Sequence, residues 1–174
     1  MRRTRVWDAL QAEGPRDDIV VKGWVRTKRD SKGFSFLEIN DGSCLKNLQA
    51  VVDHHISGAQ LLESIHTGAA VSLQGSLAES PGQGQRWELK AERINILGPA
   101  DPETYPLQKK RHSDEFLRTI PQIRPRTNKY GALYRMRSEL AWAIHSFFHH
   151  RSFLYVHSPI ITGLDCEGAG ELFR

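Results

Sequence analysis

Two groups of basic side chains are candidates for a binding function, because clustered cations can bind a polyanion. One lies within residues 22–32 and is opposed only by Asp30. The other lies within residues 109–137, which hold nine basic and two acidic side chains, whereas residues 1–100 are nearly neutral. The first group consists of Lys22, Arg26, Lys28, Arg29 and Lys32. Such runs also occur as solvated surface, so they favour a nucleic-acid partner without establishing one.

Composition excludes several other kinds of chemistry. The chain has 174 residues, of which 39% are hydrophobic and 25% charged, with a formal net charge of +4, as in ordinary globular proteins. Cys44 and Cys166 form no CxxC pair, and neighbouring histidines point apart, so we expect no metal site. No apolar run approaches the roughly 20 residues of a membrane-spanning helix. We therefore expect a cytoplasmic protein with no membrane partner.

The elements that would position the basic groups have a period of mostly two from residue 19 onward. The pattern predicts strands over residues 19–26, 34–39, 48–53, 69–77 and 86 to about 96. Between the third and fourth strands, residues 57–66 are predicted to be a short helix. Three strands, a helix and two strands are the order of an OB-fold, a five-stranded β-barrel. Residues 1–98 are therefore predicted to form an OB-fold, with a small barrel that binds no ligand as the alternative.

Three local signals refine this barrel. Gly23 lies within the first strand and would allow it to bend sharply. Ser57 and Gln60 have the spacing of a capping box at the start of the short helix. The alternation changes phase between Ala91 and Ile94, which indicates a β-bulge in the fifth strand.

A proline-rich segment separates the barrel from the C-terminal part of the chain. Three prolines within residues 99–106 prevent helix and strand, so residues 99–131 are predicted to be a basic linker. Residues 132–151 have helical spacing, and residues 153–159 are predicted to be a strand. The helix carries an apolar stripe of Leu133, Met136, Leu140, Ile144 and Phe147. One helix and one strand cannot close a core, so either a second copy covers the stripe or residues 132–174 begin a larger domain.

Several segments resemble a known family. The linker carries YPLQKKRHS at residues 105–113, FLR at 116–118 and RPRTN at 124–128. The tail carries YVHSPIITG at 155–163 and DCEGAGE at 165–171. These segments resemble asparaginyl-tRNA synthetases, and the barrel resembles the anticodon-binding OB domain of the asparaginyl, aspartyl and lysyl class II subgroup.

The resemblance implies a two-step ligase. Asparagine and ATP, with magnesium, would give asparaginyl-adenylate and pyrophosphate, and the asparaginyl group would pass to the 3′-terminal ribose of tRNA(Asn). Residues 132–174 would begin the α+β catalytic domain, with the helix and strand as class II motif 1, which ends in Pro159. Motif 1 implies a homodimer, whose interface would consist of Leu133, Met136, Leu140, Ile144, Phe147 and Pro159.

Within the barrel, the resemblance implies anticodon-reading side chains. Phe36 would stack on the middle base, and Gln49 would hydrogen-bond the edge of its uracil. Glu88 would accept hydrogen bonds from guanine at the first position, unless it forms a salt bridge to Lys90 or Arg86. Phe36 could instead be core, and Gln49 an exposed edge residue. Arg26 and Arg29 are assigned to anticodon phosphates or bases, with solvated surface as the alternative.

Outside the barrel, four further residues receive roles. Lys109, Lys110 and Arg111 are assigned to the tRNA backbone, where they would confer salt-dependent affinity, or they neutralise a domain interface. Glu167 is assigned to the α-ammonium group of the amino-acid substrate, with a solvated loop position as the alternative. The sequence to Arg174 contains neither the motif 2 nor the motif 3 arginine of class II synthetases, so we expect no catalytic residue in it and no adenylate formation by this chain alone.

Two other functions remain open at this point. The chain could be a stand-alone OB-fold module that binds tRNA or single strands and carries a dimerisation appendix. It could also belong to an aspartyl-tRNA synthetase of relaxed tRNA specificity, although the run at residues 165–170 favours asparagine.

Overall fold

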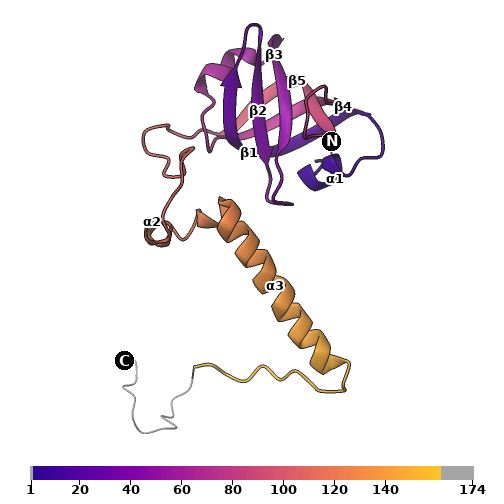
Figure 1. Ribbon diagram of the computed structural model, residues 1–174, viewed down its shortest axis with the longest axis vertical. Coiled ribbons are helices and arrows are strands. Elements are labelled where there is room, and N and C mark those ends of the chain that lie inside the picture. The colour runs from indigo at the N-terminus through magenta and orange to yellow at the C-terminus, as the bar shows by residue number, and fades with distance from the viewer. Residues whose placement is uncertain (1, 162–174) are drawn as a thin grey trace. The chain divides into compact units, whose positions relative to one another are not determined.

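The computed structural model describes residues 2–161 and divides the chain into two compact units, Met1–Ala132 and Leu133–Arg174. The barrel lies in the first unit (Figure 1). The elements are α1 (Val6–Leu10), β1 (Arg16–Asp30), β2 (Phe34–Asn40), β3 (Leu48–Ser57), η1 (Ala59–Ser64), β4 (Ala70–Glu79), β5 (Trp87–Gly98), α2 (Asp114–Thr119), η2 (Arg124–Arg126) and α3 (Asn128–His149). The predicted order of three strands, a short helix and two strands is confirmed.

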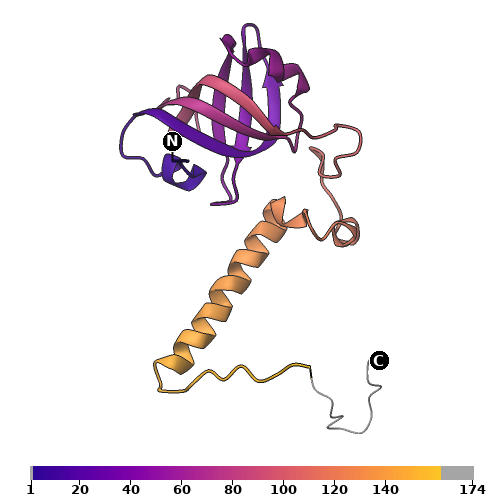
Figure 2. The same cartoon turned by 180° about the vertical axis from the view of Figure 1, so that it is seen from behind.

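The five strands close into a barrel in the order β1-β2-β3-β5-β4, with β1 also paired to β4 (Figure 2). The long strand β1 closes it by pairing with β4 up to Trp24 and with β2 from Trp24 onward. Gly23 precedes this change of partner, and a Cβ there would lie 2.8 Å from the carbonyl oxygen of Asn40. Glycine at this position therefore allows two strands to pass closely where the barrel turns.

The predicted bulge in β5 is present. Arg93 pairs with Gln74 and Ala91 pairs with Gly75, so Glu92 is the extra residue in the ladder. The bulge lets both Ala91 and Ile94 face the core, because one added residue restores the inward phase.

The predicted capping box is wrong. The turn after β3 is the 3-10 helix η1, whose N-cap is Gly58 in the left-handed region, at a φ of 89°, and no side chain caps it. A Cβ at Gly58 would lie 2.2 Å from the carbonyl oxygen of Ile94. Close packing against β5, rather than a Ser57 hydroxyl, therefore determines how this turn begins.

The sequence patterns did not predict helix α1, which covers one end of the barrel. Val6, Ala9 and Ala12 are buried in the same core cluster as the inward residues of the strands. Trp87, which is 1% exposed, donates from its indole Nε1 to the carbonyl of Ala12 over 3.0 Å. The N-terminal segment is thus part of the core, although α1 is only five residues long.

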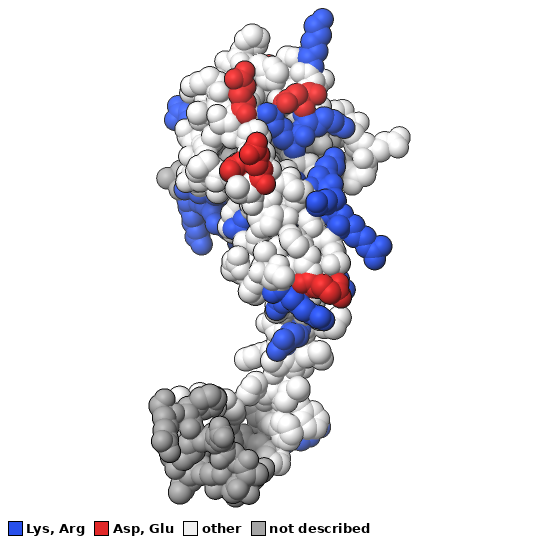
Figure 3. Space-filling view, turned by 90° about the vertical axis from the view of Figure 1, so that its left-hand side faces the viewer, with Lys and Arg blue, Asp and Glu red and all other residues white. Residues whose placement is uncertain are grey.

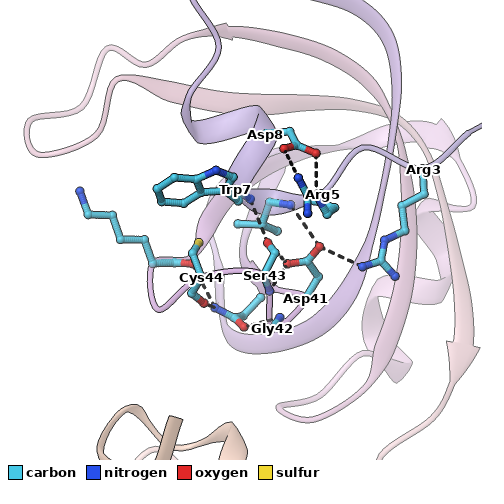
Figure 4. A network of polar contacts seen from close by, with 11 residues as sticks. Arg3, Arg5, Trp7, Asp8, Asp41, Gly42, Ser43 and Cys44 are labelled. Carbon is cyan, nitrogen blue, oxygen red and sulfur yellow. Dashed lines mark hydrogen bonds and ion pairs between the residues drawn. The ribbon is translucent and has the colours of Figure 1, made fainter. Parts of the chain in front are cut away.

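The loop between β2 and β3 caps α1 from a distance in sequence. The carboxylate of Asp41 accepts from the backbone N–H of Val6 over 3.1 Å and from Arg3 over 3.1 Å, and Ser43 Oγ accepts from the N–H of Trp7 over 3.0 Å (Figure 4). Asp41 also accepts from the hydroxyl and N–H of Ser43. Burial would raise the pKa of Asp41, but the hydrogen bonds from Ser43 and Val6, together with the Arg3 charge, outweigh burial and lower that pKa.

Removal of this cap provides a test on stability. We expect Asp41→Ala to lower the free energy of unfolding by about 1–2 kcal/mol, because the first amides of α1 lose their acceptor. Since the folded-state pKa of Asp41 is lowered, its contribution is full above the unfolded value of about 4 and is lost as the pH falls through the folded value. Urea unfolding of the wild type and Asp41→Asn should therefore show a stability difference at pH 7 that shrinks below about pH 4. A pH-independent difference would contradict the charged cap.

The remaining described residues form the linker and one long helix. Residues 99–106 contain neither helix nor strand, as predicted, and Leu107 and Leu117 are buried. Helix α3 corresponds to the helix predicted over 132–151 but begins at Asn128, after Thr127, whose hydroxyl accepts from the N–H of Tyr130. No helix in residues 2–161 is long and apolar enough to cross a membrane.

The strand predicted over 153–159 is wrong for this structure, in which residues 153–159 have no assigned secondary structure. A strand needs a partner for its backbone groups, and residues 133–161 of the second unit supply none. The apolar stripe of α3 is exposed, with Met136 61% and Phe147 50% accessible, and Pro159 is exposed as well.

Candidate nucleic-acid interface

The outward face of β2, β3 and β5 brings the predicted anticodon residues together. Along β2, Ser35, Leu37 and Ile39 are buried and the residues between them point outward. Across the sheet, Phe36 pairs with Val51, and Val51 pairs with Lys90. In the adjacent outward row, Gln49 lies between Glu38 and Glu88. An aromatic ring, an amide and a carboxylate thus share one face, because side chains two residues apart on a strand point the same way.

Phe36 lies in a small aromatic cluster on this face. Its ring contacts that of Phe34 edge to face, with centroids 5.2 Å apart, and Phe34 is 37% exposed. The guanidinium of Arg29 lies 4.7 Å from the centre of the Phe36 ring. Phe36 is therefore not a core residue, and Arg29 adds a cation beside a ring on which an unpaired base can stack.

Gln49 and Glu88 are hydrogen-bonded to each other. Gln49 Nε2 donates to Glu88 Oε2 over 3.4 Å, and Ser80 Oγ donates to the same oxygen over 3.0 Å. Glu88 is only 4% exposed, so the carboxylate assigned to the first base is largely buried. The alternative salt bridge to Lys90 or Arg86 is not among the ion pairs of residues 2–161. Arg86 instead donates to the carbonyl of Glu13.

The structure does not place Arg26 with this cluster. Arg26 donates to the backbone carbonyl of Arg126 and lies 3.5 Å from Asn128 Oδ1. Arg126 in turn lies 4.3 Å from the ring centre of Trp24 and 3.3 Å from the hydroxyl of Tyr105. Arg26 therefore ties β1 to the linker, which corrects its assignment to the anticodon.

The comparisons with known proteins agree with this geometry. Residues 19–97 match the family described as the OB-fold nucleic acid binding domain. Over its whole length the chain is 59% identical to an asparagine–tRNA ligase of Oleidesulfovibrio alaskensis and 62% identical to one of Nitratidesulfovibrio vulgaris, and it spans 38% of the length of each. The fold also matches a crystal structure of asparaginyl-tRNA synthetase from Pyrococcus horikoshii, with a TM-score of 0.80 at 19% sequence identity. The match covers 92% of this chain and 38% of that chain.

Over its whole length the chain is similar to asparagine–tRNA ligases. It corresponds to the N-terminal portion of the relatives it matches.

The sequence patterns did not predict a polar cluster that lies where β1 ends and β2 begins. Ser35, which is fully buried, donates to Asp30 over 2.6 Å and lies 3.0 Å from Nε2 of His54. The hydrogen bond from Ser35 lowers the pKa of Asp30 against the effect of burial, and the charge of Lys28 adds to the lowering. The cluster fixes the turn that precedes Phe34, and an inward serine in an apolar alternation was its only signal in the sequence.

The remaining assigned residues lie elsewhere in the chain. Lys109, Lys110 and Arg111 are exposed on the linker, and basic side chains project into solvent on the side drawn in Figure 3. Glu167 lies outside the described residues. Within residues 2–161, no group of His, Cys, Asp and Glu side chains could hold a metal ion.

Proposed function

We propose that the barrel of this chain binds the anticodon of tRNA(Asn). The proposal rests on the outward face that Phe36, Gln49 and Glu88 share. Their ring, amide and carboxylate complement two unstacked bases, the guanine at the first anticodon position and the uracil at the middle position. The ring offers a stacking surface, the amide can both donate to and accept from uracil, and the carboxylate accepts from guanine. Arg29 on this face and the exposed linker cations Lys109, Lys110 and Arg111 add phosphate-binding charge.

We further propose that the longer protein is an asparagine–tRNA ligase. The carboxylate of asparagine would attack the α-phosphorus of ATP and release pyrophosphate, and the terminal ribose hydroxyl of the tRNA would then attack the acyl group and release AMP. We assign ATP and magnesium binding to the part of the longer relatives that this chain does not cover, because the sequence to Arg174 contains neither the motif 2 nor the motif 3 arginine. Glu167 would bind the substrate ammonium group. A compartment that holds tRNA is required, so we place the protein in the cytoplasm.

We also propose that the exposed stripe of α3 is a homodimer interface as part of motif 1. Its large apolar side chains face solvent over several helical turns, and this pattern marks a protein contact more often than free surface. The stripe comprises Leu133, Met136, Leu140, Ile144 and Phe147, to which the exposed Pro159 is added.

Binding of anticodon stem-loops tests the anticodon proposal. We expect the chain to bind a GUU stem-loop more tightly than stem-loops that differ only in the first base. Glu88→Gln should reduce the preference for guanine about tenfold, because an amide replaces a charged acceptor. Fluorescence anisotropy with four stem-loops gives each ratio directly. No preference in the wild type would contradict the proposal, and an equal loss for all four bases in Glu88→Gln would make Glu88 a structural residue.

A further inference from the structure

The carboxylate of Glu88 has one occupied oxygen and one open oxygen. Oε2 accepts from both Gln49 Nε2 and Ser80 Oγ, whereas Oε1 has no hydrogen-bond partner among residues 2–161. No buried side-chain nitrogen or oxygen in the described part of the chain lacks a partner. Oε1 therefore reaches solvent, although the residue as a whole is 4% exposed.

Ser80 is itself held in a fixed orientation. It follows β4 directly, and its N–H donates to the carbonyl of Arg86 over 2.9 Å. Its Oγ accepts from the N–H of Gly82 over 3.2 Å and from Gln85 Nε2 over 2.9 Å. A hydroxyl has two acceptor lone pairs and one proton, so with both lone pairs engaged the proton is directed to Glu88.

We propose that Ser80 is a positioning residue for recognition of the first anticodon base. Its hydroxyl holds Glu88 Oε2 in place and leaves Oε1 as the acceptor that faces the ligand. This inference rests on the anticodon-binding function proposed above. Through Ser80, the β4–β5 loop contributes to specificity for the base, although Ser80 itself does not contact the base.

The geometry predicts an order of preference among the four bases. An ionised carboxylate can only accept hydrogen bonds. Guanine presents two donors, the ring N1–H and the exocyclic amine, and uracil presents one ring N–H between two carbonyls. Adenine and cytosine present an unprotonated ring nitrogen, which repels a carboxylate oxygen. We expect guanine to bind best, then uracil, and adenine and cytosine least well.

Three variants of the chain test the role of Ser80. Ser80→Ala removes the donor, Ser80→Thr retains it, and Ser72→Ala is the matched control on β4, since Ser72 makes no side-chain hydrogen bond in the described part of the chain. The ratio of affinities for guanine and adenine stem-loops should fall about fivefold in Ser80→Ala. It should stay near the wild-type ratio in Ser80→Thr and Ser72→Ala. Circular dichroism at the binding temperature shows that each variant is folded.

The other outcomes overturn defined parts of the proposal. If the wild type prefers guanine and Ser80→Ala retains that preference, the role of Ser80 is wrong and anticodon binding stands. If Ser80→Ala weakens binding of all four stem-loops by the same factor, Ser80 is a structural residue of the loop. If the wild type shows no preference, anticodon recognition through Glu88 is itself wrong, and the inference fails with it.

Discussion

Replacing Trp87 with alanine is expected to lower the free energy of unfolding of the barrel by about 3–5 kcal/mol. Trp87 is among the largest fully buried side chains, and it lies where β5 meets the N-terminal segment. The substitution leaves a cavity the size of an indole and an unpaired carbonyl at Ala12. Both costs are large in a core that the strands have already closed.

Two further variants divide this cost into its parts. Trp87→Phe keeps most of the apolar volume and loses the hydrogen bond, so a smaller loss of about 1–2 kcal/mol is expected. Trp142→Ala removes an indole that is 71% exposed on α3 and should change stability by less than about 0.5 kcal/mol. Urea unfolding followed by circular dichroism measures all three. An equal effect at Trp87 and Trp142 would show that the N-terminal segment does not complete the core.

The core residues of the barrel could be predicted because the alternation of apolar and polar residues along a strand indicates which side chains are buried. Trp87, Leu89 and Ala91 are buried, and the phase change before Ile94 corresponds to the one extra residue at Glu92. Each of these inferences compares residues that are neighbours in sequence. Period two in a strand reflects the geometry of the chain itself, so no distant contact is needed to interpret it.

The features that were missed depend on partners far away in sequence. Helix α1 is too short to form from propensity alone, and its first amides are capped by Asp41 and Ser43. Its burial therefore depends on a loop that lies beyond two strands of the barrel in sequence, which no local pattern contains. The strand predicted over 153–159 fails for the related reason that a strand is stabilised by a neighbour and not by its own sequence.

The candidate site was partly predictable, for the same physical reason. Phe36 and Gln49 lie on adjacent strands, and their outward direction follows from the period of each strand. Arg26 was misassigned because its partners, Arg126 and Asn128, lie about a hundred residues away. The burial of Glu88 was missed because Ser80, which donates to it, and Gln85, which donates to Ser80, belong to a loop without periodic sequence.

Replacing Phe36 with alanine is expected to weaken binding of a GUU stem-loop by about 1–3 kcal/mol, the range for loss of one aromatic stacking partner. The ring is half-buried on the outward face and is held by Phe34 and by the Arg29 guanidinium, so little ordering is needed when a base stacks on it. Stacking is insensitive to base identity, so all four first-base stem-loops should lose the same factor. This uniform loss distinguishes Phe36 from Glu88, whose substitution should change the ratios between bases.

Phe36→Leu and Phe34→Ala are the controls for this experiment. Leucine retains apolar volume without a π-face, so Phe36→Leu should bind almost as weakly as Phe36→Ala if stacking is the interaction. Phe34 supports the ring from its edge, and Phe34→Ala should therefore have a smaller effect than Phe36→Ala. Anisotropy titrations are made at one salt concentration, because contacts to the phosphate backbone depend on salt. Their contribution to the affinity is then the same for every variant. Wild-type affinity in Phe36→Ala would remove the stacking role, while a full loss restored by leucine would show that the ring only fills space.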